Sequence, residues 1–217
     1  MSKQILLRVS RRFLVCLELL DHLFVRFLTT VAMLLLPSRA FAHQGTGLPG
    51  GFEAGFLHPL TGFDHMLAMV SVGLWGAFLG RPLIMALPMI FPSMMVVGAA
   101  LAMVGVPLPP VELGIAVSVL VLGAMILFAV RAPIPVACGV VALFALFHGY
   151  AHGAELPSAA DPVGYSAGFV LCTGMLHVVG IAIGTLRDRP GGQTLLRGAG
   201  GAIAVCGLFF LTTALRS

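Results

Sequence analysis

Long apolar runs, separated by short segments that hold proline, glycine and charged residues, make up most of the chain after the first quarter. Each run is close to the roughly 20 residues that a helix needs to cross a bilayer. The pattern predicts an all-α membrane protein with six transmembrane helices at about 56–79, 83–105, 111–130, 134–153, 163–186 and 196–215. Because the connections between them are short, we expect a compact bundle in which neighbouring helices pack antiparallel.

Residues 1–42 follow a different pattern, which is typical of a cleavable N-terminal signal segment. A basic start is followed by an apolar run over residues 27–36 and by the small-residue site Ala40-Phe-Ala42. Charged residues interrupt the upstream stretch, so we expect cleavage rather than retention as a membrane anchor. The mature chain would then be residues 43–217, a single six-helix domain that begins with His43.

The composition agrees with a membrane protein and argues against a nucleic-acid partner. Hydrophobic residues make up 59% of the chain and charged residues only 9%, whereas soluble proteins have about 25% charged residues. The formal net charge is +4, but the basic excess lies in the first 42 residues, and the remainder carries six residues of each sign. No basic surface is left that would bind nucleic acid. The expected surroundings are therefore a lipid bilayer.

The arginines of the mature chain predict its orientation. If the mature amino terminus is outside the cell, five of the six fall on cytoplasmic turns, namely Arg81, Arg131, Arg187, Arg189 and Arg197. The external segments then carry acidic residues, among them Glu112 and Glu155. Cytoplasmic loops are enriched in Lys and Arg in membrane proteins. We expect the protein in the cytoplasmic membrane of a bacterium, with its mature amino terminus outside.

Six ionisable side chains interrupt these apolar segments, although such groups are costly at membrane depth and usually functional there. They are His58, Asp64, His65, His148, His152 and His177. On a continuous helix, His58 and His65 would share one face. His148 and His152 would form a second stacked pair, with Glu155 continuing the stripe to the outer end. His177 would be the deepest group, and taken alone it is more typical of a helix-to-helix hydrogen bond than of a metal ligand.

This set of side chains predicts a metal or proton pathway. Imidazoles with one or two carboxylates suit a borderline divalent ion such as nickel, cobalt or zinc better than magnesium or calcium. A single carboxylate offsets part of the charge without binding so tightly that release fails. The free amine and the imidazole of His43 would add a chelating pair at the outer surface.

Two other classes of protein use similar residues. His148-x3-His152 has the histidine spacing of a zinc protease helix, but Gly149 stands where the general-base glutamate should be. Histidines on facing helices also ligate haem, although Asp64 beside His65 argues against that class. We do not expect an enzyme. The chain also has no phosphate-binding Gly-x4-Gly-Lys-Ser/Thr loop, so ATP is not the expected driving force.

The segment His58-Pro-Leu-Thr-Gly-Phe-Asp-His65, with Val72-Gly-Leu-Trp75 after it, resembles the signature of the HupE/UreJ family of nickel and cobalt permeases. The blocks Phe147-His-Gly-Tyr-Ala-His-Gly-Ala-Glu155 and Gly168-Phe-x4-Gly-x2-His177 are similar to two further helices of that family. The resemblance implies secondary uptake of Ni²⁺ or Co²⁺ for metalloenzymes such as hydrogenase or urease. It assigns metal handling to the six residues above, and it implies a transported ion rather than a prosthetic group.

Overall fold

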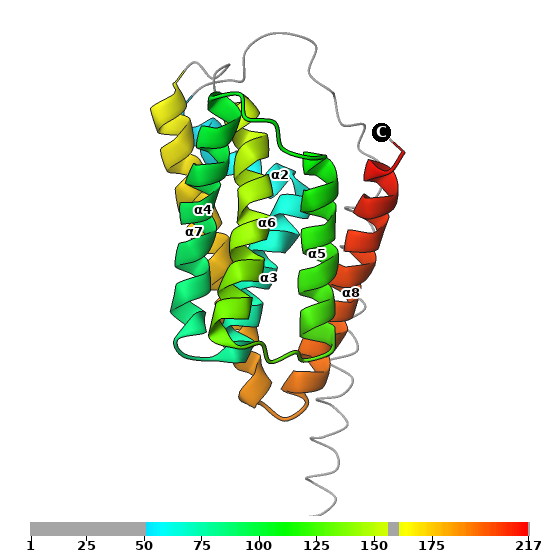
Figure 1. The fold of residues 1–217 in the computed structure, drawn as a ribbon. Helices are drawn as coiled ribbons and strands as arrows, with labels where there is room; N and C mark the ends of the chain where they lie inside the picture. The colour runs from blue at the N-terminus through cyan, green and yellow to red at the C-terminus, as the bar shows by residue number, and fades with distance from the viewer. Residues whose placement is uncertain (1–50, 156–160, 217) are drawn as a thin grey trace, which may run out of the picture. The chain divides into compact units, whose positions relative to one another are not determined.

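The fold was analysed in a computed structural model, which describes residues 51–155 and 161–216. The helices in these ranges are α2 (Phe52–Thr61), α3 (Phe63–Leu79), α4 (Leu83–Met103), α5 (Val111–Leu127), α6 (Ile134–Glu155), α7 (Pro162–Gly184), the short 3-10 helix η2 (Thr185–Asp188) and α8 (Gly192–Ala214), shown in Figure 1. The described residues contain no strand, so the all-α prediction is confirmed for them. The predicted signal segment lies outside the described residues.

Several of these helices are long and apolar enough to cross a membrane. Four qualify individually: α4, α6, α8, and α7 extended through η2. The pair α2 and α3 qualifies as one broken span, whereas α5 is apolar but only 17 residues long. The chain is therefore a multi-pass membrane protein. The first apolar segment of the described residues, α2 with α3, is not a straight helix.

The prediction of one continuous helix over residues 56–79 is wrong. α2 and α3 meet at Gly62 with a bend of 84°, and Gly62 has an extended backbone with φ −85° and ψ 101°. The hydroxyl of Thr61 donates to the carbonyl of His58 at 2.8 Å, which satisfies a carbonyl at the end of α2. Glycine is a poor helix former, and the break falls there rather than at Pro59. His58 and His65 consequently do not lie on one face of one helix.

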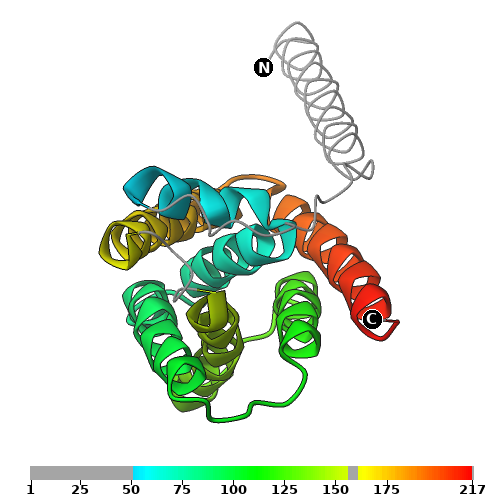
Figure 2. The ribbon, with the colours of Figure 1, turned by 90° about the horizontal axis from the view of Figure 1, so that it is seen from above.

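α3 is the helix around which the others assemble. It packs against α4, α5, α7 and α8, and the view in Figure 2 shows it near the middle of the helices. The most extensive interfaces join helices that are not consecutive in sequence: α4 with α6, α5 with α8, and α3 with α7. Gly73 of α3 lies so close to the carbonyl of His177 on α7 that a Cβ atom there would overlap it. The expectation that sequence neighbours pack together therefore holds only for part of the bundle.

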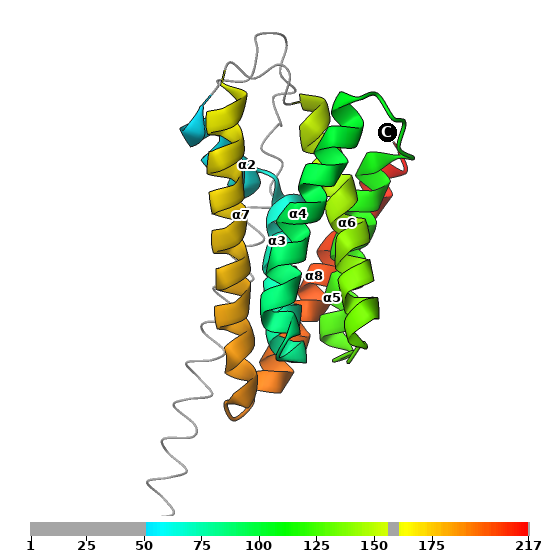
Figure 3. The same cartoon turned by 60° about the vertical axis from the view of Figure 1, so that its left-hand side comes forward.

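The arginine-bearing connections gather at one end of the helices. The turn between α3 and α4, the segment between α5 and α6, and η2 with the start of α8 all lie at the lower end in Figures 1 and 3. The guanidinium of Arg187 donates to the carbonyls of Ala77 and Phe78 at 2.8 and 2.6 Å. Arg197 donates to the carbonyl of Leu127 at 2.8 Å. These arginines cap the C-terminal ends of α3 and α5, where a positive charge is favourable.

Candidate functional site

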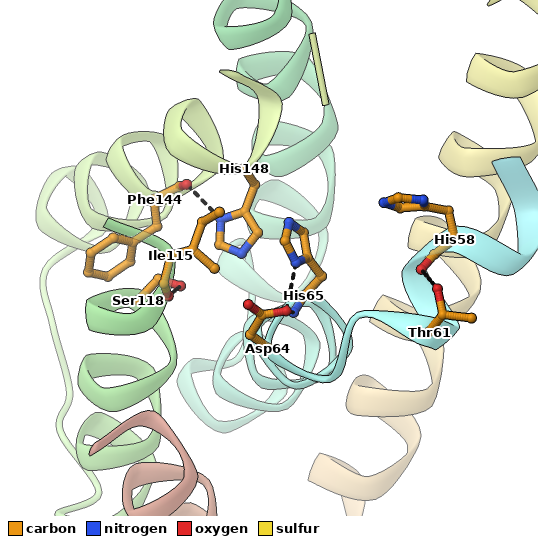
Figure 4. A network of polar contacts seen from close by, with 8 residues as sticks. All are labelled: His58, Thr61, Asp64, His65, Ile115, Ser118, Phe144 and His148. Carbon is orange, nitrogen blue, oxygen red and sulfur yellow. Dashed lines mark hydrogen bonds and ion pairs between the residues drawn. The ribbon is translucent and has the colours of Figure 1, made fainter. Parts of the chain in front are cut away.

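Four histidines from three helices meet near the break between α2 and α3. The ring centroids of His58 and His152 lie 4.9 Å apart, those of His152 and His65 lie 4.7 Å apart, and those of His65 and His148 lie 4.9 Å apart. We call these four side chains the histidine cluster. Figure 4 shows His65 and His148 side by side, with the ring of His58 directed toward them from α2. The groups expected to be spread along a pathway thus form one continuous cluster.

The broken helix explains how the cluster is assembled. His65 lies in the first turn of α3 and contacts both His148 and His152, which stand one turn apart on α6. Because the chain turns at Gly62, α2 approaches the cluster from another direction, and His58 reaches the far side of His152. A straight helix would have placed His58 about 10 Å along the axis from His65. The bend is therefore a structural requirement of the site.

Two hydrogen bonds fix the orientation of the inner rings. Nδ1 of His65 lies 2.8 Å from a carboxylate oxygen of Asp64, which also accepts from the backbone N–H of His65. Nδ1 of His148 lies 2.9 Å from the carbonyl oxygen of Phe144. Because a carbonyl can only accept, Nδ1 of His148 carries the proton. In a neutral ring the lone pair then lies on Nε2, which is the usual arrangement of a metal-binding histidine held by an outer partner.

Four ring nitrogens of the cluster have no hydrogen-bond partner among the described residues. They are Nε2 of His65, Nε2 of His148, and both nitrogens of His152, and all are inaccessible to solvent. A buried polar atom without a partner is costly, so native structures seldom keep one without a reason. Several such atoms facing one another match the donor set of a borderline divalent metal ion.

A carboxylate completes one side of the cluster. One ligand atom each from His58, His152 and Glu155 lie within 4.8 Å of one another, and Glu155 is the last residue of α6. Asp64 stands on the other side, where it holds His65. The sequence grouped Asp64 with the histidines as a candidate ligand, and the geometry gives it the position of an orienting group.

His177 lies apart from the cluster. Its ring contacts Phe91 at a centroid distance of 5.3 Å, and Phe91 also contacts His148 at 5.4 Å. Both ring nitrogens of His177 are buried without a partner among the described residues. The hydrogen bond between helices that a lone histidine often makes is therefore not formed. His43, the other candidate at the outer surface, falls outside the described residues.

The sequence did not single out two side chains of α7 that wall the cluster. Tyr165 and Phe169 are buried, and their rings lie 5.8 and 6.1 Å from that of His58. A cavity of about 90 Å³ between α4, α6 and α7 reaches His152, Tyr165 and Thr173. The hydroxyls of Tyr165 and Thr173 are buried without a partner among the described residues. Isolated hydroxyls in an apolar run were the only signal that sequence reasoning could have used.

The geometry disfavours both alternative classes. Ring centroids 4.7 to 4.9 Å apart leave no room for a porphyrin and its iron between two histidines that would both ligate the iron. In the zinc protease motif a glutamate follows the first histidine. Here a Cβ atom on Gly149 would overlap the carbonyl of Met95 on α4, so no longer side chain fits at that position.

Comparison with known proteins shows which family the chain resembles. A family model described as HupE / UreJ protein matches residues 31–210. A curated relative named Protein HupE, from Rhizobium leguminosarum bv. viciae, is 46% identical over 183 residues, which cover 84% of this chain and 95% of that protein. No solved structure matches the chain significantly.

Proposed function

Because the chain belongs to the HupE / UreJ family, we propose that it is a secondary transporter that imports Ni²⁺ or Co²⁺ across the cytoplasmic membrane of a bacterium. The observation that carries this proposal is the histidine cluster, in which four buried ring nitrogens lack partners among the described residues. Ligands of this type bind nickel, cobalt and zinc, and family membership favours the first two. The imported ion would supply metalloenzymes such as hydrogenase or urease.

The arginines support an orientation of the chain in the membrane. Lys and Arg are enriched on the cytoplasmic side of membrane proteins, so the end that carries Arg81, Arg131, Arg187, Arg189 and Arg197 would face the cytoplasm. The start of α2 and the end of α6 lie at the opposite end, with Glu155 beside the histidine cluster. The cluster would therefore be the first binding site that an external ion meets.

The membrane potential is a sufficient driving force. Moving one charge through the membrane potential releases about 2.3 kcal/mol per 100 mV, so a divalent ion gains about 4.6 kcal/mol when it moves toward an inside-negative cytoplasm. Each 1.4 kcal/mol is a factor of ten in concentration, so this corresponds to roughly a thousandfold accumulation. Only one carboxylate, that of Glu155, lies near the candidate ligand atoms of His58 and His152, because Asp64 acts as an orienting group for His65. This limits the negative charge next to a bound ion and so favours release of the ion.

The direct test is uptake of radioactive ⁶³Ni²⁺ by cells that produce the full chain, with Co²⁺ or Zn²⁺ added in competition. We expect accumulation that collapses when the potential is dissipated, and inhibition by Co²⁺ stronger than inhibition by Zn²⁺. Cells that produce His65→Ala at equal membrane abundance are the matched control, since they lack the central ring of the cluster. Equal accumulation in both strains would contradict the proposal.

A further inference from the structure

The ring of Phe91 contacts one histidine of the cluster and also His177, which lies apart from it. Its ring is completely buried and meets His148 of the histidine cluster at 5.4 Å and His177 at 5.3 Å, with interplanar angles of 60° and 82°. Both histidines present buried nitrogens that have no partner among the described residues. The phenyl ring offers no ligand to a metal ion. An ion that passed from the cluster to His177 along these ring contacts would meet this ring.

Both histidines are held in place by contacts that do not involve Phe91. Nδ1 of His148 is fixed by the carbonyl of Phe144. His177 belongs to the stretch of α7 that packs in backbone contact with Gly73 of α3. Neither helix can shift easily at these points without losing that contact. α4 is itself in close backbone contact with α6 at Met95, so the part of α4 left to move is the turn around Phe91, before that contact.

The sequence of α4 weakens the helix at this level. Pro88 and Pro92 lie inside α4 on either side of Phe91. A proline has no N–H, so the helical hydrogen bonds that would end on the carbonyls of Ile84 and Pro88 cannot form, and such positions allow a helix to bend. The hydroxyl of Ser93 also donates back to the carbonyl of Met89 at 2.8 Å. Hydrogen bonds of this kind are associated with helix bending.

We propose that Phe91 is the gate of the transport pathway, and that it separates an outer binding site, the histidine cluster, from an inner one at His177. The inference rests on the proposed function, because it assigns a transport role to a side chain of the same pathway. The buried phenyl ring excludes water from the space between the histidine cluster and His177. Hydrophobic constrictions of this kind block ions. The bound metal would pass only when the proline-flanked segment of α4 moves the ring away.

The test uses the purified full chain in liposomes with an imposed inside-negative potential. An internal metal-quenched dye reports Ni²⁺ influx, and an internal pH dye reports proton leak in the absence of metal. Visible absorption of added Co²⁺ reports binding by histidine nitrogens in detergent.

The variants are Phe91→Ala, which removes the ring, and Phe91→Trp, which enlarges it. Leu87→Ala is the matched control, because Leu87 is also fully buried on α4 and lies one turn away.

We expect Phe91→Trp to slow Ni²⁺ influx about tenfold, which corresponds to ~1.4 kcal/mol in the barrier, while the Co²⁺ spectrum and affinity stay as in the unmodified chain. Phe91→Ala should leak protons at least about tenfold faster than Leu87→Ala, because it removes the apolar barrier. If Phe91→Trp does not fold, Phe91→Leu is tested in its place. Its proton leak should lie between that of the unmodified chain and that of Phe91→Ala.

Two failures are distinguishable. If the unmodified chain carries Ni²⁺ but both Phe91 variants behave like Leu87→Ala, Phe91 is a packing residue and only the gate is overturned. If the unmodified chain binds Co²⁺ and admits no Ni²⁺ at any potential, the proposed function is overturned and the gate with it.

Discussion

The ring of His65 on α3 lies 4.7 Å from the ring of His152 on α6, and this contact joins the two halves of the candidate site. On one side of it, His152 contacts His58 of α2. On the other, His65 contacts His148. In this series of ring contacts, His58 is therefore connected to His148 through the His65–His152 pair. Substitutions at these two positions should have the largest effects on metal binding.

Asp64→Asn should weaken metal binding rather than abolish it. The carboxylate accepts from Nδ1 of His65 at 2.8 Å and so leaves the lone pair of a neutral ring on Nε2. An amide can rotate to present its NH₂ group and favour the other tautomer. Loss of such an outer partner costs about 10–100-fold in metal affinity. Titration of the purified variant with Co²⁺, followed by visible absorption, measures the change.

The matched control for this substitution is Asp188→Asn. Asp188 is exposed in η2 and is paired only with the neighbouring Arg187 among the described residues. Its substitution should leave the Co²⁺ affinity unchanged. If Asp64→Asn binds Co²⁺ as tightly as Asp188→Asn does, Asp64 does not orient His65.

His152→Ala and His177→Ala should separate binding from transport. His152 touches both His58 and His65, so its removal should eliminate the histidine-dependent Co²⁺ spectrum and the uptake together. His177 is separated from the cluster by Phe91, so His177→Ala should keep most of the spectrum while uptake falls. Parallel measurements of the spectrum and of ⁶³Ni²⁺ uptake decide this. Loss of both signals in His177→Ala would mean that His177 belongs to the first binding site.

The sequence predicted the helices and their polar residues well, but it could not predict how these residues meet. Apolar run lengths located α4, α6, α7 and α8 to within a few residues. The 84° bend at Gly62 was missed because Pro59 was the more obvious breaker, and a single Gly inside an apolar run carries little information. The role of Phe91 was also invisible, since a phenylalanine in an apolar helix differs from its neighbours only through its contacts.

Gly149→Ala should destabilise the protein, whereas Gly139→Ala on the same helix should not. A Cβ atom on Gly149 would overlap the carbonyl of Met95 on α4, and α4 with α6 forms the most extensive interface of the bundle. A Cβ atom on Gly139 would meet nothing within 4 Å. Overpacking of this kind costs about 1–3 kcal/mol. Thermal unfolding in detergent should give a lower midpoint for Gly149→Ala only, and equal midpoints would show that the two helices can separate without cost.

Reporter fusions should show that the chain crosses the membrane an even number of times after residue 43. The four long helices, the broken pair α2 and α3, and α5 would together give six crossings. A reporter that is active only in the periplasm should function after Ser217. One that is active only in the cytoplasm should function when inserted next to Arg189 in the turn between η2 and α8. The same location for both reporters would mean that α8 does not cross.

Uptake at a subsaturating metal concentration should fall as the external pH is lowered. Metal ligation requires the neutral imidazole ring, so protons and metal compete for the histidine cluster. This competition sets the direction of the pH effect. Acid favours the protonated ring and lowers the occupancy of the cluster by metal, and added metal restores that occupancy. The measurement is the half-saturating Ni²⁺ concentration in liposomes at clamped potential, with external and internal pH varied separately. It should rise in external acid while the maximal rate changes little. A rate that instead increases in external acid would indicate import coupled to protons, in which the proton gradient adds to the membrane potential as a driving force.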